Sequence, residues 1–309
     1  MRKMFDFNKA FKKILIVYAA LFVAGIIVAA VFGVNLDINF KGGTKISYSY
    51  TGDLADKDIK TVVDEKIKAK YELTKSTSIA GDTKTFEISL VGKDALSAEN
   101  QEELSKALTE KFKDNKIQVY NSTSVSPSLA GTFLIKSLVA VTITAILVVI
   151  YVGIRFRKIG GVSAALTALV ALVFDVLVTF FTCVFFGLQI DSNYMAVVLT
   201  ILGYSLNDTI VIYDRVRENR RLDPDSEIGD VVNLSINQTF KRNVITSVTT
   251  FLAVMTIVVV SELFGLQSLR TFAIPMAFGL ISGGISSLFI AGPLWVIWKR
   301  SRAKKDAKK

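Results

Sequence analysis

Residues 159–190 decide the fold of this chain. They read IGGVSAALTALVALVFDVLVTFFTCVFFGLQI, and Asp175 is the only charged side chain among them. The next run, residues 192–213, reads SNYMAVVLTILGYSLNDTIVIY and carries only Asp208. Because about 20 mostly apolar residues cross the hydrocarbon core of a bilayer, each run predicts a membrane-spanning helix.

Four further apolar runs complete the membrane part, and none contains a charged residue: residues 14–33, 137–154, 243–261 and 271–298. A hydrophobic share of 51% and a mean hydropathy of +0.46 also favour lipid over water as the solvent. We therefore expect an α-helical polytopic membrane protein with six transmembrane helices. The first run has an alternative interpretation as a cleaved signal peptide, because basic residues precede it and Val31-Phe32-Gly33 loosely fits a cleavage site. Its apolar core is longer than the usual 7 to 15 or so residues, so we expect it to be retained.

The charge distribution predicts the orientation of the spans. The formal net charge is +10, yet residues 35–136 hold 15 basic and 15 acidic side chains. The basic excess lies in segments that alternate with the spans: residues 2–13, 155–158, 215–242 and 299–309. Since cytosolic segments are rich in Lys and Arg, we expect both termini in the cytosol and residues 35–136 outside it. This pattern favours membrane lipid over nucleic acid as the reason for the basic charge.

Residues 35–136 predict a small external domain between the first two spans. Strand patterns occur at residues 44–50, 76–79, 85–91 and 117–120, with a hairpin turn expected around Gly81-Asp82. Two helices separate the strands, and we expect Asp53 to cap the first and Ser97 the second. The order βαββαβ is typical of an α+β ferredoxin-like sandwich. No catalytic constellation is evident, so we expect a binding or lever module; an inert plug that solubilises the outer face is the alternative.

Several kinds of chemistry are excluded by composition. The chain has no histidine, which removes Ser/His/Asp triads and His-ligated metals. Its single cysteine, Cys183, cannot form an intramolecular disulfide. No GxxxxGK[ST] loop occurs, so we expect no ATP hydrolysis, no enzyme activity, no metal and no cofactor. Any work that the chain does must draw on another energy source.

Asp208 is the most costly residue of the fourth span. An Asp at the centre of a bilayer costs about 2.5 to 3.5 kcal/mol on insertion scales, and such acids commonly relay protons or ions. Tyr204 and Ser205 precede it by one helical turn, and we expect them to hydrogen-bond its carboxyl, with Asn207 as a further polar neighbour. A purely structural hydrogen bond between helices is the alternative role.

Arg242 is the expected basic partner of Asp208. It opens the fifth span, and Thr246 continues its helical face one turn later. A short connection joins the fourth and fifth spans, which makes them neighbours. A buried acid with a movable basic partner can load and release a proton. Alternatively, Arg242 anchors the helix by reaching to the membrane surface.

Two other features each have two interpretations. Asp175 lies deep in the third span and is either a tie between helices or a relay site. Gly42-Gly43 lies at the root of the external domain and is either part of a hinge or a static tight turn.

Three motifs carry a family resemblance. GYSLNDTIV at residues 203–211, followed by DRVREN at 214–219, resembles the fourth-span signature of the SecF family. NQT at 237–239, with Arg242 and TS at 246–247, resembles its entry to the fifth span, and FKGGT at 40–44 resembles its glycine turn after the first. By position, Asp208 matches the family's proton-relay acid and Arg242 its essential basic residue. Two departures are Phe174-Asp175, where many members have His-Asp, and Lys41, where a small hydroxyl residue is common.

The resemblance implies a function and a location. It implies a member of the RND-like superfamily in the bacterial cytoplasmic membrane that pairs with SecD and associates with the SecYEG channel. Such a subunit uses the proton-motive force, or a sodium gradient, to draw preproteins outward. The alternatives are half of an RND-type lipid or drug exporter and a non-transporting membrane scaffold or sensor. We expect four parts. Residues 1–34 hold the cytosolic N-terminus and the first span, and residues 35–136 form the external domain. Residues 137–298 hold the remaining spans, and residues 299–309 form a basic cytosolic tail.

Overall fold

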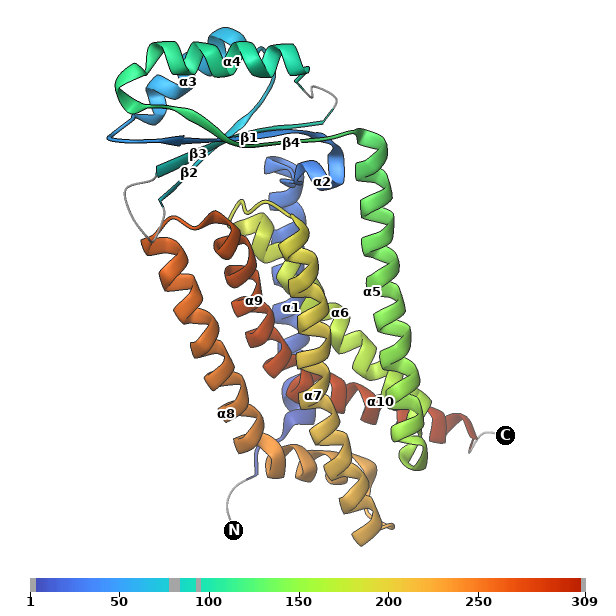
Figure 1. Cartoon of the computed structure of the whole chain (residues 1–309). Helices are drawn as coiled ribbons and strands as arrows, with labels where there is room; N and C mark the ends of the chain where they lie inside the picture. The colour runs from blue at the N-terminus through green and yellow to red at the C-terminus, as the bar shows by residue number, and fades with distance from the viewer. Residues whose placement is uncertain (1–3, 78–83, 93–95, 307–309) are drawn as a thin grey trace.

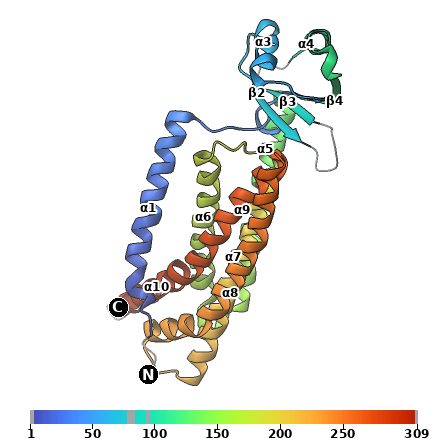
Figure 2. The same cartoon turned by 90° about the vertical axis from the view of Figure 1, so that its left-hand side faces the viewer.

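Six helices form the membrane bundle of this computed structural model, which describes residues 4–77, 84–92 and 96–306 (Figure 1). Each is long and apolar enough to cross a bilayer, which confirms the predicted six spans of a multi-pass membrane protein. They are α1 (Phe7–Phe32), α5 (Pro127–Arg155), α6 (Gly161–Phe185), α7 (Ser192–Leu222), α8 (Ile228–Leu263) and the run of α9 (Gln267–Ser286) into α10 (Gly292–Asp306). The two termini lie at the end of the bundle away from the β-sheet (Figures 1 and 2).

Several helices extend beyond the apolar runs that predict them. α5 begins at Pro127, because Ser126 caps its first turn and proline is well tolerated at the first helical position. α7 and α8 extend past the apolar runs toward each other and leave only residues 223–227 as a connection. The basic residues between the fourth and fifth spans therefore stand mainly on helical extensions, not on a loop.

The last span is not one straight helix. A π-helical turn, Ser287–Ala291, follows α9, and Pro293 in the next turn has no N–H to donate. α10 runs in a different direction from α9, across the end of the bundle that carries the termini (Figure 1). Trp295 fixes this direction, since its indole N–H donates to Ser163 Oγ of α6 at 2.9 Å.

Between α1 and α5 lies a small domain with the predicted order βαββαβ. Its elements are β1 (Gly43–Tyr50), α3 (Asp56–Lys66), β2 (Glu72–Thr77), β3 (Lys84–Val91), α4 (Ala98–Lys111) and β4 (Gln118–Val125). The strands form one antiparallel sheet in the order β2-β3-β1-β4. α3 and α4 cover one face, where alternate strand residues such as Ile46, Tyr48 and Ile88 pack against Leu104 and Leu108.

Some details of this domain differ from the prediction. Ser97 caps α4 as expected, but α3 begins after Ala55, which makes no side-chain cap, so the prediction that Asp53 caps this helix is wrong. Asp53 instead pairs with Lys84 on the neighbouring strand at 2.5 Å. β2 begins earlier and β4 ends later than their sequence patterns indicate. The expected turn at Gly81-Asp82 lies outside the described residues.

The other face of the sheet is turned toward the bundle (Figures 1 and 2). A short helix, α2 (Ile38–Lys41), follows α1 and leads into β1. Just before it, Leu36 forms a parallel bridge with Ile190 of the α6–α7 connection, with Asp37 N donating to Ile190 O at 3.0 Å. This bridge fastens the root of the domain to the membrane helices.

Candidate functional site

Asp208 lies inside the bundle on α7, with only 2% of its surface exposed. A single side-chain hydrogen bond reaches its carboxyl among the described residues, donated by Ser247 Oγ of α8 at 3.2 Å. A buried carboxylate normally collects several donors, because an unpaired charge in a low-dielectric medium is costly. Asp208 is therefore weakly held.

Arg242 lies on α8, five residues before Ser247, the residue that donates to Asp208. Within the described part of the chain Arg242 and Asp208 form no ion pair, and the Arg242 side chain is exposed. Arg242 and Asn207 both line a polar cavity of about 730 Å³ between α7 and α8, at the end of the bundle that carries the termini. The Arg242 side chain therefore has free space beside it, whereas Asp208 itself does not line this cavity.

Asp175 of α6 contrasts with Asp208 in its surroundings. It is fully buried, and its carboxyl accepts hydrogen bonds from three serine hydroxyls: Ser205 (2.6 Å), Ser282 (2.6 Å) and Ser286 (2.8 Å). Tyr18 of α1 extends the network, since its hydroxyl donates to Ser282 O at 3.2 Å and lies 3.0 Å from Ser282 Oγ. Four helices, α1, α6, α7 and α9, therefore meet around one carboxyl group.

The structure distributes the predicted polar residues differently from the sequence-based prediction. Ser205 donates to Asp175 and not to Asp208, and the Tyr204 hydroxyl is buried without a hydrogen-bond partner in the described residues, so the prediction that both bond Asp208 is wrong. Thr246 donates to Arg242 O within its own helix at 2.9 Å. Its neighbour Ser247 makes the contact with Asp208 instead. Ser247, Ser282 and Ser286 are the residues that the prediction missed.

Small residues of α9 allow these contacts by bringing the helices close together. A Cβ added at Gly279 would lie 2.7 Å from Ile201 of α7, and one added at Gly283 would lie 3.0 Å from Ser205 Cβ. One added at Gly284 would lie 3.0 Å from Ser247 Oγ of α8. Close approach through small residues is a common mode of helix packing in membranes. α9 is thus the shared neighbour of the Asp175 and Asp208 sites.

Gly42 and Gly43 have backbone conformations that favour glycine. Their φ values are +81° and +142°, and a Cβ added at Gly43 would lie 2.0 Å from Leu90 O. This packing accounts for the glycine pair as a tight turn at the start of β1. A hinge role for the pair remains a prediction.

Together these features define a class: a polytopic membrane protein with two buried acids in its helical bundle and a sheet domain seated on one end. The family described as "Protein export membrane protein SecD/SecF, C-terminal" matches residues 104–301. The chain belongs to this SecD/SecF family of protein-export membrane proteins.

Individual relatives extend the likeness to nearly the whole chain. The protein translocase subunit SecF of Alicyclobacillus acidocaldarius is 33% identical over 99% of this chain and 96% of its own length. The SecDF protein of Bacillus subtilis is 34% identical over 98% of this chain, which spans only 39% of that longer protein. A crystal structure of SecDF from Thermus thermophilus superposes with a TM-score of 0.79 at 28% identity, covering 97% of this chain and 39% of the solved one.

Proposed function

We propose that this chain is an accessory subunit of Sec-dependent protein export that couples an ion gradient to the late, outward movement of preproteins. Its similarity to SecF subunits along nearly their full length supports a role beside SecD, because the Bacillus relative is named as a SecDF protein. The SecYEG channel and the translocating preprotein are the further proposed partners. The proposed location is the bacterial cytoplasmic membrane, with both termini in the cytosol and the sheet domain outside, in keeping with the basic segments at the end that carries the termini.

The weakly held carboxyl of Asp208 carries this proposal. It lies in the bundle with one hydroxyl donor, and Arg242, five residues before that donor on α8, lines a polar cavity. Such an acid can accept a proton or a sodium ion and release it when the helices shift, and each charge crossing the potential supplies about 2.3 kcal/mol per 100 mV. No nucleotide or other cofactor is required in this scheme.

The sheet domain transmits the movement in this proposal. Its strand order β2-β3-β1-β4, with α3 and α4 on one face, supports the ferredoxin-like interpretation. The Leu36–Ile190 bridge couples the root of the domain to the membrane helices, and Gly42-Gly43 lies between that bridge and β1. Asp175 acts as a structural tie in this scheme and not as the ion carrier.

The test is gradient-dependent export by an Asp208→Asn variant, in vesicles that contain the chain, its SecD partner and the Sec channel. Asparagine keeps the size and the hydrogen-bonding ability of the side chain but cannot titrate. We expect the gradient-dependent part of export to fall by at least about tenfold, which is the loss of a group acting in the coupled step. Asp225→Asn, at an exposed acid of the α7–α8 connection, is the matched control and should export normally. Full gradient-dependent export by Asp208→Asn would refute the proposal.

A further inference from the structure

A cavity of about 540 Å³ lies between the sheet and the facing end of the membrane helices. The sheet contributes its open face, the side not covered by α3 and α4. The bundle contributes the α6–α7 connection at Gln189 and Asp191, and residues 266–269 and Thr271 at the start of α9. Under the proposed orientation, this cavity opens at the outer surface of the membrane.

The strand register explains the composition of the open face. Ser89 of β3 stands opposite Lys45 on β1 and opposite Glu72 on β2, while Glu87 stands opposite Ser47 and Thr74. Since alternate residues of a strand point to opposite faces, these polar side chains share one face, and the apolar residues between them face α3 and α4. Hydroxyl and charged groups therefore line the side of the cavity that the sheet forms.

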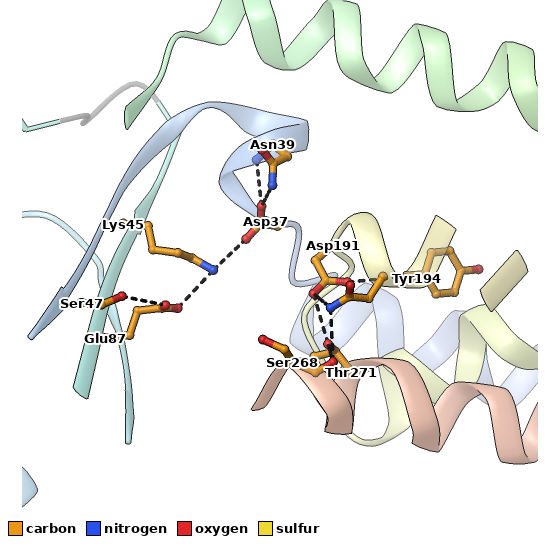
Figure 3. A network of polar contacts seen from close by, with 10 residues as sticks. Asp37, Asn39, Lys45, Ser47, Glu87, Asp191, Tyr194, Ser268 and Thr271 are labelled. Atoms are coloured by element: carbon orange, nitrogen blue, oxygen red, sulfur yellow. Dashed lines mark hydrogen bonds and ion pairs between the residues drawn. The ribbon is translucent and has the colours of Figure 1, made fainter. Parts of the chain in front are cut away.

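Negative charge predominates in this cavity. Its lining includes the acids Glu72, Glu87 and Asp191 and one cation, Lys45. Lys45 is already engaged, because its Nζ lies 3.1 Å from both Asp37 and Glu87 (Figure 3). In the described part of the chain, Glu72 and Asp191 have no ion-pair partner.

Asp191 is held at the floor of the cavity by neutral donors alone (Figure 3). Its carboxyl accepts hydrogen bonds from Tyr194 N (3.1 Å), Asn193 Nδ2 (3.1 Å) and Thr271 Oγ1 (3.1 Å). Burial raises the pKa of Asp191, although these hydrogen bonds oppose the shift. A cation beside this carboxyl would favour its charged form.

Ser89 supplies an independent sign of a ligand. Its side chain is only 5% exposed and lines the cavity, yet its Oγ has no hydrogen-bond partner among the described residues. Buried hydroxyls are nearly always paired with protein, water or ligand. The site thus offers an unused hydroxyl next to Lys45 and Glu72 in the register.

We propose that this cavity binds a lysine or arginine side chain of an extended polypeptide, with Glu72, Glu87 and Asp191 supplying the negative charge of the lining and Ser89 bonding the polar end of the ligand. The inference rests on the proposed function, which brings a secreted chain to this surface. The volume exceeds what a bare metal ion needs, and no group of three or more metal-ligating side chains occurs in residues 4–77, 84–92 or 96–306. Hydroxyls along β2, such as those of Thr74 and Ser76, remain for the backbone of the peptide.

A cation site at this surface suits outward transport. The membrane potential is negative inside and opposes the outward passage of each lysine or arginine. A negative cavity on the outer side would retain such residues once they have crossed and would reduce their backward movement. The effect would depend on the charge of the exported chain and not on its fold.

The experiment measures binding of a fluorescent, capped peptide of alternating serine and lysine to the full chain in nanodiscs. Matched peptides carry glutamate or norleucine in place of lysine. We expect the lysine peptide to bind at least about tenfold more tightly than the glutamate peptide at low salt, since like charges repel and salt screens the attraction. Glu72→Gln should weaken lysine-peptide binding about twofold to fivefold, the usual size for a partly exposed charge pair.

Two control variants assign the binding to the cavity. Glu103→Gln, on the exposed surface of α4, should leave peptide binding unchanged. Asp208→Asn should bind peptide normally, because the ion gradient plays no part in this assay. If the unmodified chain binds no peptide while Asp208→Asn still loses export, the proposed function stands and only the cation site is overturned. Equal binding of all three peptides, or displacement of the lysine peptide by micromolar Ca²⁺ or Mg²⁺, would also overturn it.

Discussion

Asp175 and Asp208 lie in the same bundle and share α9 as a neighbouring helix, yet their surroundings differ. Asp175 accepts three serine hydroxyl bonds of 2.6 to 2.8 Å and is fully buried. Asp208 accepts one bond of 3.2 Å from α8, the helix on which Arg242 lines a polar cavity. An acid held by many donors resists a change of partner, whereas an acid held by one can exchange it. Depth in the membrane alone therefore does not identify the working acid.

The largest effect on stability is expected from Asp175→Asn. The new amide replaces one carboxyl oxygen with an N–H₂ group in a site where three serine hydroxyls donate, so at least one serine must turn its hydroxyl hydrogen to another acceptor and the network must rearrange. We expect a loss of about 2 to 4 kcal/mol in the free energy of unfolding. Thermal unfolding in nanodiscs can be followed by the fluorescence of buried Trp295. Asp208→Asn is the matched variant, and a loss as large as that of Asp175→Asn would remove the distinction between the two sites.

Single serine deletions provide a finer comparison. Ser286→Ala removes one of three donors to Asp175 and should cost about 1 to 2 kcal/mol, because it leaves a fully buried carboxyl oxygen with one donor fewer. Ser247→Ala removes the long bond to Asp208 and should cost less than about 1 kcal/mol, while slowing gradient-dependent export. The same unfolding assay, together with the export assay, checks both. If Ser247→Ala were the more destabilising change and left export intact, Asp208 would be a structural link between helices and not the ion carrier.

Much of this arrangement was predictable from the amino-acid sequence. The apolar runs predict all six spans, and the βαββαβ order follows from local patterns, because both depend on residues close in the chain. The partners of the acids were not predictable. Thr246 and Ser247 differ by one position, which is about 100° around a helix, and only tertiary packing decides which of them faces Asp208.

Asp175 illustrates the same limit across longer distances. Ser282 and Ser286 are four residues apart on α9 and lie on one helical face, but their contact with α6 depends on how α9 is rotated in the bundle. The glycines of α9 favour that rotation by letting α7 and α8 approach. The prediction that Asp53 caps α3 was wrong for the same reason: Asp53 pairs with Lys84 of β3, a contact that depends on tertiary packing and not on the local sequence.

The most direct test of the central claim, that Asp208 and not Asp175 carries the coupling ion, is the infrared difference spectrum of the protein in nanodiscs between acidic and alkaline buffer. A protonated carboxyl has a C=O band that disappears when it ionises. We predict one titrating band from the interior of the bundle that is absent in Asp208→Asn and retained in Ser286→Ala, where the Asp175 site is perturbed instead. A band that persists in Asp208→Asn and shifts in Ser286→Ala would assign the titration to Asp175 and contradict this account.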